Sequence, residues 1–116
     1  MNVLIFDDDV AAGPGAYHFP DALNVRIYDR ADDCLRLVSQ LRPDVVLMDY
    51  HMSSSLKGEH AIRQLRIRYS IDALPIIGIS SAESLNQKMM AAGANRAVVK
   101  KQLQELLLEL AEALSA

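Results

Sequence analysis

The sequence predicts a doubly wound α/β fold, a (βα)5 arrangement with a parallel five-stranded sheet and a degraded first crossover helix. Two observations predict it. Five short apolar runs lack polar alternation, as is typical of strands that helices cover on both faces. Segments with a helical apolar period separate these runs, so strands and helices alternate along the chain. The expected strands are residues 3–6, 25–28, 45–48, 76–79 and 97–99.

Four segments have the apolar spacing of helices that cover a sheet. The first of them is closed by Pro43. The last has leucines in a 3.6-residue rhythm, and Leu108 points away from this stripe. The expected helices are residues 31–41, 58–69, 83–92 and the C-terminal segment with the stripe Leu103, Leu106, Leu107, Leu110 and Leu114.

The first crossover is irregular. Parallel neighbouring strands need a crossover connection, yet residues 10–23 contain Gly13, Pro14, Gly15 and Pro20, which leave room for a turn or two of helix. Two outcomes stay open: the apolar side chains of this segment cover the sheet in an irregular conformation, or the missing helix leaves apolar surface for a partner. The side chains concerned are Val10, Tyr17, Phe19 and Leu23.

Length and composition limit the classes of function. A chain of 116 residues has room for one domain, residues 1–116. The net charge is −3 and the basic residues are dispersed, which argues against a nucleic-acid surface. No apolar run approaches the ~20 residues that cross a bilayer, and the single cysteine, Cys34, excludes an intrachain disulfide. We therefore expect a cytoplasmic domain without direct nucleic-acid or membrane contact.

Polar residues follow four of the expected strands. Three acids, residues 7–9, follow the first strand, Asp49 follows the third, Ser80 ends the fourth and Lys100 ends the fifth. In this fold the carboxyl ends of the strands form one edge, where sites lie. Clustered carboxylates resist joint ionisation unless a cation neutralises them, and such a cluster suits Mg²⁺. The ordinary alternatives are a solvated acidic turn, a serine that caps the next helix and a surface lysine.

Together these groups suffice for phosphoryl transfer. A carboxylate can act as the nucleophile, Mg²⁺ offsets the phosphoryl charge, and a hydroxyl and an ammonium can bind the equatorial oxygens. The product of such a transfer is an aspartyl phosphate.

Over nearly its whole length the chain resembles the receiver domain of two-component response regulators, in its single-domain, chemotaxis-regulator-like form. The matching motifs are VLIFDDD, VVLMDYHM followed by Gly58, PIIGISSAE and AAGANRAVVK. The resemblance implies a flavodoxin-like fold with Asp49 as phosphoacceptor. It also implies that Mg²⁺ is bound by Asp8, Asp49 and the main-chain carbonyl of His51, and that Asp7 supports the ion through water.

The resemblance assigns roles to two further strand-end residues. Ser80 takes the place of the switch hydroxyl and Lys100 that of the lysine that pairs with the phosphoryl group. Asp9 lies outside this set, and we interpret it as an exposed acid or a helix cap.

The sequence also departs from the family pattern. Ala97 stands where the family usually has an aromatic residue. In the family, movement of the switch hydroxyl is coupled to rotation of that aromatic ring, and the alanine puts this coupling in doubt. Lys101 replaces the usual proline after the lysine, so a cis peptide is not expected. In the loop after the phosphoacceptor, Ser53 replaces a frequent proline and Gly58 comes one residue late. The stretch 80–93 is shorter than usual.

The function implied is that of a phosphoacceptor in a two-component phosphorelay. A histidine kinase or phosphotransfer protein would donate to Asp49, and the output would be contact with a downstream protein target, or a homodimer. For that contact we select Leu108 with the adjacent Arg96 and Ala97. The chemistry is confined to phosphorylation and dephosphorylation of the domain itself, so we do not expect an enzyme.

Two other functions stay open. One is a pseudo-receiver, an interaction module that takes no phosphate, which the departures support. The other is a haloacid-dehalogenase-like phosphatase, which shares Asp7-x-Asp9, Ser80 and Lys100. That family needs an acidic pair beyond the lysine, where this chain has only Glu105, Glu109 and Glu112 of the last expected helix.

Overall fold

Five parallel strands form one sheet in the order β2-β1-β3-β4-β5. The computed structural model of the protein describes residues 1–52 and 56–113. Each strand contains the range expected from the sequence and extends it by one residue. The predicted doubly wound, flavodoxin-like fold is therefore confirmed. The strands are β1 (Asn2–Phe6), β2 (Asn24–Tyr28), β3 (Val45–Asp49), β4 (Ile76–Ser80) and β5 (Arg96–Val99).

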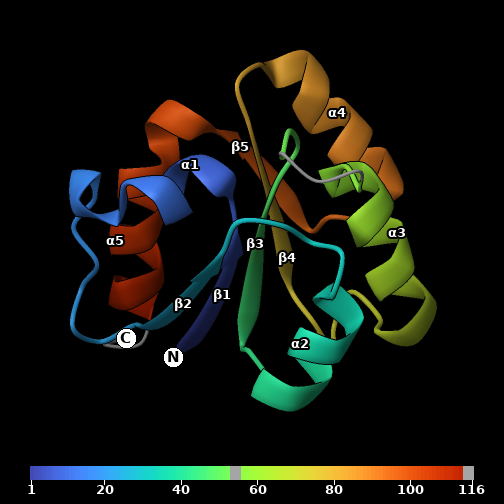
Figure 1. Ribbon diagram of the computed structural model, residues 1–116, viewed down its shortest axis with the longest axis horizontal. Helices are drawn as coiled ribbons and strands as arrows, with labels where there is room; N and C mark the ends of the chain where they lie inside the picture. The colour runs from blue at the N-terminus through green and yellow to red at the C-terminus, as the bar shows by residue number, and fades with distance from the viewer. Residues whose placement is uncertain (53–55, 114–116) are drawn as a thin grey trace.

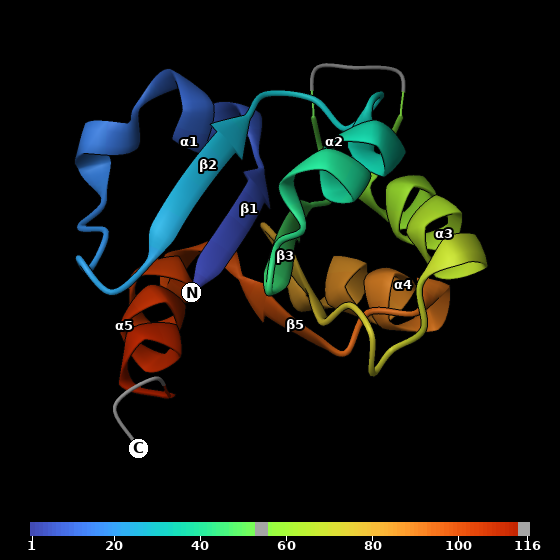
Figure 2. The same ribbon diagram turned by 90° about the horizontal axis from the view of Figure 1, so that it is seen from below.

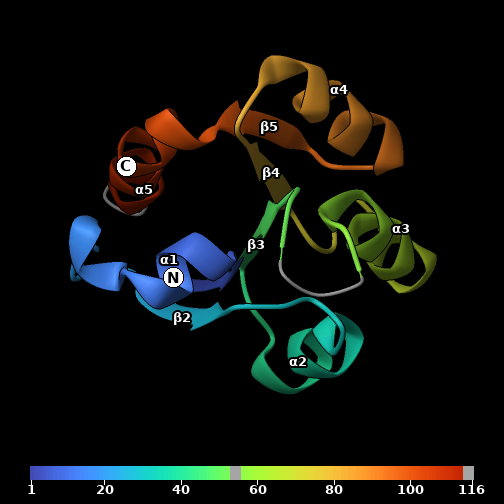
Figure 3. The same ribbon diagram turned by 45° about the horizontal axis from the view of Figure 1, so that its top comes forward.

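Helices cover both faces of the sheet (Figure 1). Helices α1 and α5 lie on one face and α2, α3 and α4 on the other, as Figures 2 and 3 show from two further directions. No helix within residues 1–52 and 56–113 combines the length and apolarity needed to span a bilayer. The helices are α1 (Asp8–Ala12), α2 (Cys34–Leu41), α3 (Gly58–Arg68), α4 (Glu83–Ala92) and α5 (Leu103–Ala113), with 3₁₀ turns at Pro14–Ala16 and Lys100–Gln102.

Helix α2 begins three residues later than the expected start at residue 31. The backbone N–H of Cys34 donates to the carbonyl of Ala31 at 3.0 Å, which closes a turn before the helix. The prediction for the start of this helix was therefore wrong, because a local turn precedes the apolar period.

The sheet separates two apolar cores. Successive strand residues point to opposite faces, so β1 sends Leu4 and Phe6 toward α2, α3 and α4, and Val3 and Ile5 toward α1 and α5. All five residues of the central strand β3 are buried. This burial on both faces explains why the strands read as continuous apolar runs.

Helix α5 confirms the predicted apolar stripe. Leu103, Leu106 and Leu107 are buried against the sheet, and Leu110 packs against them. Each fully buried leucine contributes about 2 kcal/mol. Leu108 is 44% exposed on the outer side of the helix. The expected last member of the stripe, residue 114, lies outside the described residues.

The first crossover covers the sheet mostly without regular structure. Val10 and Leu23 are buried in the core beneath α5, and Tyr17 and Phe19 pack against that core. The side chain of Gln104 in α5 exchanges two 2.7 Å hydrogen bonds with the backbone of His18. Of the two outcomes left open by the sequence, coverage of the sheet by this segment is the one confirmed (Figure 1).

Candidate functional site

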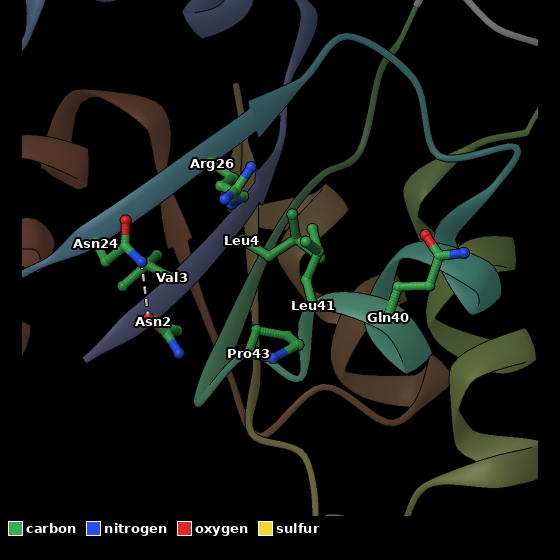
Figure 4. Close-up of a pocket in the computed structure, with 8 residues that line it drawn as sticks. All are labelled: Asn2, Val3, Leu4, Asn24, Arg26, Gln40, Leu41 and Pro43. Atoms are coloured by element: carbon green, nitrogen blue, oxygen red, sulfur yellow. Dashed lines mark hydrogen bonds between the residues drawn. The ribbon is translucent and has the colours of Figure 1, made fainter.

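The acids lie at the carboxyl edge of the sheet, and one of the hollows in the surface lies at the opposite edge. A hollow of about 180 Å³ is lined by residues at the amino ends of β1 and β2, among them Asn2, Asn24 and Arg26 (Figure 4). Asp7 directly follows β1, and Asp49 is the last residue of β3. Because parallel strands end at one edge, the site predicted from the sequence lies at the carboxyl edge and not in this hollow.

The carboxyl edge brings the predicted site residues together. Asp7, Asp8 and Asp49 each place a carboxylate oxygen within 4.8 Å of the others. The Nζ atom of Lys100, the first residue after β5, lies 3.0 Å from Asp7 and 3.3 Å from Asp49. Ser80 ends β4 next to β3, with its hydroxyl directed toward α4.

Asp7 both caps α1 and faces the cluster. Its Oδ1 atom accepts hydrogen bonds from the backbone N–H groups of Asp9 (2.9 Å) and Val10 (3.1 Å), which is the usual arrangement of an N-cap. Its Oδ2 atom is buried and accepts no hydrogen bond, although the Lys100 ammonium pairs with it electrostatically. The Lys100 ammonium is thus the charged partner of this buried oxygen, and a metal cation could take its place.

Asp49 is buried at the end of a buried strand, with 3% of its surface exposed. Burial, and after it the charge of Asp7, raises its pKa from 3.8 to about 7. The ammonium of Lys100 acts in the opposite direction and offsets part of this rise. Asp49 is therefore a carboxylate whose negative charge the protein alone compensates incompletely.

Lys100 is shared by three carboxylates. Burial disfavours its charge, but its hydrogen bond to Asp9 and the charges of Asp49 and Asp7 outweigh burial and raise its pKa. The distance from Nζ to Oδ2 of Asp9 is 3.0 Å. Asp9 is the exposed acid expected from the sequence, but its contact with Lys100 was not expected. The helix cap is Asp7 and not Asp9.

Ser80 is bonded to the start of α4. Its Oγ lies 2.7 Å from the carbonyl oxygen of Ala82 and 2.5 Å from the side-chain oxygen of Asn86. One hydroxyl hydrogen serves one acceptor at a time, so Ser80 donates to the carbonyl of Ala82 or to Oδ1 of Asn86. The alternative role of Ser80 as helix cap is excluded, because Ala82 is the N-cap residue and no side chain caps α4.

Sequence reasoning missed Asn86. It lies six residues after Ser80 in the first half of α4, and no motif or period marks it. Its contact with Ser80 depends on how the β4–α4 loop turns, which a single sequence does not reveal.

The segment after Asp49 is held by a close approach of α3. A Cβ atom on Gly58 would lie 2.1 Å from the backbone oxygen of Asp49, so no side chain fits there. The backbone N–H of Gly58 donates to the carbonyl of Tyr50 at 3.0 Å. The buried Tyr50 hydroxyl donates to Glu59 at 2.9 Å, and its ring meets that of His51 edge-on at 4.8 Å. Ser53 lies outside the described residues.

The donor set fits a hard divalent cation. The three side chains of the cluster all offer carboxylate oxygens, which Mg²⁺ and Ca²⁺ prefer. The buried Oδ2 of Asp7 accepts no hydrogen bond and has Lys100 as its ion-pair partner, and burial beside Asp7 makes the ionised form of Asp49 unfavourable. A cation at this cluster would satisfy the first group and stabilise the charge of the second. Asp7, Asp8 and Asp49 could therefore hold the metal.

The sequence and the fold both match response regulators. The sequence model of the response regulator receiver domain matches residues 3–112. The response regulator GacA of Pseudomonas aeruginosa is 30% identical over 98 residues, which cover 81% of this chain and 45% of that protein. A solved two-component response regulator/GGDEF domain protein superposes with a TM-score of 0.78 at 27% identity, over 99% of this chain and 49% of the other.

A second solved structure matches over nearly its full length. The BeF3-activated N-terminal receiver domain of RstA from Klebsiella pneumoniae gives a TM-score of 0.75 at 21% identity, over 97% of both chains. The chain spans about half the length of the GacA and GGDEF relatives (45% and 49%). Since the family model covers residues 3–112, the chain belongs to the response regulator receiver domain family of two-component signalling.

Proposed function

We propose that this receiver domain accepts a phosphoryl group on Asp49 from a histidine kinase or phosphotransfer protein. The observation that carries the proposal is the packing of the Lys100 ammonium and the carboxylates of Asp7 and Asp8 around the buried Asp49 carboxylate. In this proposal Asp8, Asp49 and the main-chain carbonyl of His51 bind Mg²⁺, and Asp7 supports the ion through water.

The chain's own groups account for the transfer. An Asp49 carboxylate oxygen attacks the phosphorus, and the bond from phosphorus to the donor imidazole nitrogen breaks as the new P–O bond forms. The Lys100 ammonium, 3.3 Å from Asp49, is placed to pair with an incoming phosphoryl oxygen. The Ser80 hydroxyl can donate to another after it turns from Ala82. A bound Mg²⁺ supplies charge neutralisation of the phosphoryl oxygens.

The gathered site favours this function over the alternatives. A pseudo-receiver has no need for a buried Asp49 whose negative charge is incompletely compensated. It also has no need for Lys100 and the buried Oδ2 of Asp7 beside that carboxylate. A haloacid-dehalogenase-like phosphatase would need acids beyond Lys100 in the site. Among the described residues the carboxylate cluster consists of Asp7, Asp8 and Asp49 without a glutamate of α5, and Glu109 pairs with Arg96 on β5.

Intact mass after incubation with acetyl phosphate tests the proposal. With Mg²⁺, wild-type protein should gain one phosphate, Asp49→Asn should gain none, and the surface control Asp72→Asn should behave as wild type. Without Mg²⁺ the adduct should fall at least tenfold, because charge neutralisation is lost. A folded wild type that gains no phosphate would support the pseudo-receiver. Repeated turnover of the donor without an adduct would support the phosphatase.

The output that we propose begins at α4. When the Ser80 hydroxyl turns toward a phosphoryl oxygen, it leaves the carbonyl of Ala82, and its contact with Asn86 breaks. Ala97 provides no ring to follow this movement. The change therefore acts directly on the first turns of α4, and a two-state shift of this helix is what a partner would sense.

The contact surface that we propose contains Leu108 with Arg96 and Ala97, for a downstream protein target or a second copy of the domain. Leu108→Asp should weaken self-association of the phosphorylated domain about tenfold, because a charge replaces an exposed apolar contact. Sedimentation velocity measures this. Ile67→Asp, on the far helix α3 and 88% exposed in the parent, is the matched control. Equal association of both variants, with phosphorylation intact, would show that the surface lies elsewhere.

A further inference from the structure

We propose that Asp9 is a positioning residue that holds the Lys100 ammonium when a divalent cation occupies the carboxylate cluster. This inference rests on the proposed function, since it concerns the same metal and the same lysine. The observation behind it is that Lys100 contacts two acids that belong to the cluster, Asp7 and Asp49, and one that does not, Asp9.

The cation and the ammonium compete for the same oxygens. Nζ of Lys100 lies 3.0 Å from Oδ2 of Asp7 and 3.3 Å from Oδ2 of Asp49. An ion bound by these carboxylates repels the ammonium and takes the lone pairs with which it pairs. Metal binding therefore weakens the pairing of Lys100 with Asp7 and Asp49.

Asp9 is the partner that remains for Lys100. Its Oδ2 is 3.0 Å from Nζ, and its side chain is 75% exposed, outside the cluster. The backbone of Asp9 is nevertheless held, because its N–H donates to Oδ1 of Asp7 at 2.9 Å. The ammonium can thus keep its existing pairing with Asp9, remain near Asp49, and stay available to a phosphoryl oxygen.

Asp29 serves as a control residue for the proposed role of Asp9. Asp29 is also exposed (58%), pairs with Arg30, and lines one hollow with Asp8, so it too is a charge near the cluster. Among the residues that the structure describes, Lys100 makes no ion pair with Asp29. Neutralising Asp29 therefore removes a nearby charge but no partner of the lysine.

A double-mutant cycle on metal affinity tests the inference. Mg²⁺ is titrated into the whole chain, and backbone amide NMR shifts of the cluster residues report binding without phosphorylation. Asp9→Asn should weaken Mg²⁺ binding about three- to fivefold, the range of an exposed ion pair. Asp29→Asn should change it less than twofold. Lys100→Met alone should tighten binding, because the competing cation is removed.

The decisive comparison is Asp9→Asn in the Lys100→Met background. If Asp9 acts through the lysine, its neutralisation should there change Mg²⁺ affinity less than twofold. An equal effect of Asp9→Asn in both backgrounds would mean that Asp9 acts as a distant charge only, and would overturn the inference. Lys100→Gln provides a second background if Lys100→Met does not fold, which the amide spectrum shows.

The two proposals fail in different ways. Tight Mg²⁺ binding with the expected cycle but no adduct from acetyl phosphate would overturn phosphoacceptance and support the role of Asp9. A normal phosphate adduct, together with an equal effect of Asp9→Asn on Mg²⁺ affinity in both backgrounds, would support phosphoacceptance and overturn the role of Asp9. A folded wild type that binds no Mg²⁺ would overturn the metal site and, with it, the role of Asp9.

Discussion

Gly58→Ala is expected to lower the free energy of unfolding by about 3 kcal/mol, the upper part of the range for overpacking. An alanine Cβ would lie 2.1 Å from the backbone oxygen of Asp49, 2.8 Å from its carbonyl carbon and 2.9 Å from Cα of Tyr50. All three atoms are backbone, so no side chain can move aside. The gain in helix propensity from glycine to alanine, about 1 kcal/mol, is too small to compensate.

Urea unfolding measures this loss, and two other glycines provide controls. Nothing lies within 4 Å of a Cβ on Gly15, so Gly15→Ala should stay within about 0.5 kcal/mol of wild type. A Cβ on Gly78 would meet the flexible side chain of Met89 at 2.7 Å, and Gly78→Ala should fall between the two. Equal stability of Gly58→Ala and Gly15→Ala would show that α3 can move away from Asp49 freely.

Substitution of Gly58 should affect the carboxylate cluster as well as the stability of the fold. To relieve the contact, α3 would have to move away from the backbone of Asp49, and the hydrogen bond from Gly58 to Tyr50 would lengthen. Both changes alter the backbone contacts of Asp49, the proposed phosphoacceptor, and of Tyr50. The family resemblance includes this glycine in one of its motifs, but the close approach of Gly58 to the end of β3 is a tertiary contact that only the structure reveals.

The strands and most of the site were predictable for one physical reason. Strands buried on both faces leave continuous apolar runs, and each run ends where a polar residue meets the sheet edge. Asp49, Ser80 and Lys100 therefore stood out by position alone. Their convergence followed from the parallel topology, which the structure confirms.

The contacts that the sequence did not reveal depend on short local structure. The pairing of Asp9 with Lys100 requires the five-residue helix α1, which begins at Asp8 and which glycines and prolines obscure. The contact of Ser80 with Asn86 requires a particular turn of the β4–α4 loop. Neither depends on an apolar period, so neither leaves a signal in the pattern from which the fold was inferred.

In the absence of divalent metal, the stability of the wild type is expected to fall as pH rises from about 4 to about 7. The folded protein raises the pKa of Asp49 from 3.8 to about 7, mainly through burial and then through the charge of Asp7. Between these values the folded state holds a proton that the unfolded state has released. Stability from this group is fully present below pH 3.8 and is lost as pH approaches 7.

Asp49→Asn removes this titration. At pH 7 and without metal the variant should be more stable than wild type by about 2 to 4 kcal/mol, since each unit of pKa shift corresponds to about 1.4 kcal/mol. At pH 4 the two should be nearly equal, because the wild-type carboxyl is then protonated in the folded state. Thermal unfolding across this pH range, with Asp72→Asn as control, gives the difference. If the stability of wild type and of Asp49→Asn changed in parallel with pH, the protein's own groups would already compensate the buried charge of Asp49.

Added Mg²⁺ separates the electrostatic cause from a packing effect of the amide. A cation at the cluster pairs with ionised Asp49 and stabilises the folded state by mass action. At pH 7 it should therefore raise the stability of the wild type toward that of Asp49→Asn, and should raise the variant much less, because one ligand has lost its charge. If Mg²⁺ raised both proteins equally, the ion would be acting at a site that does not include Asp49.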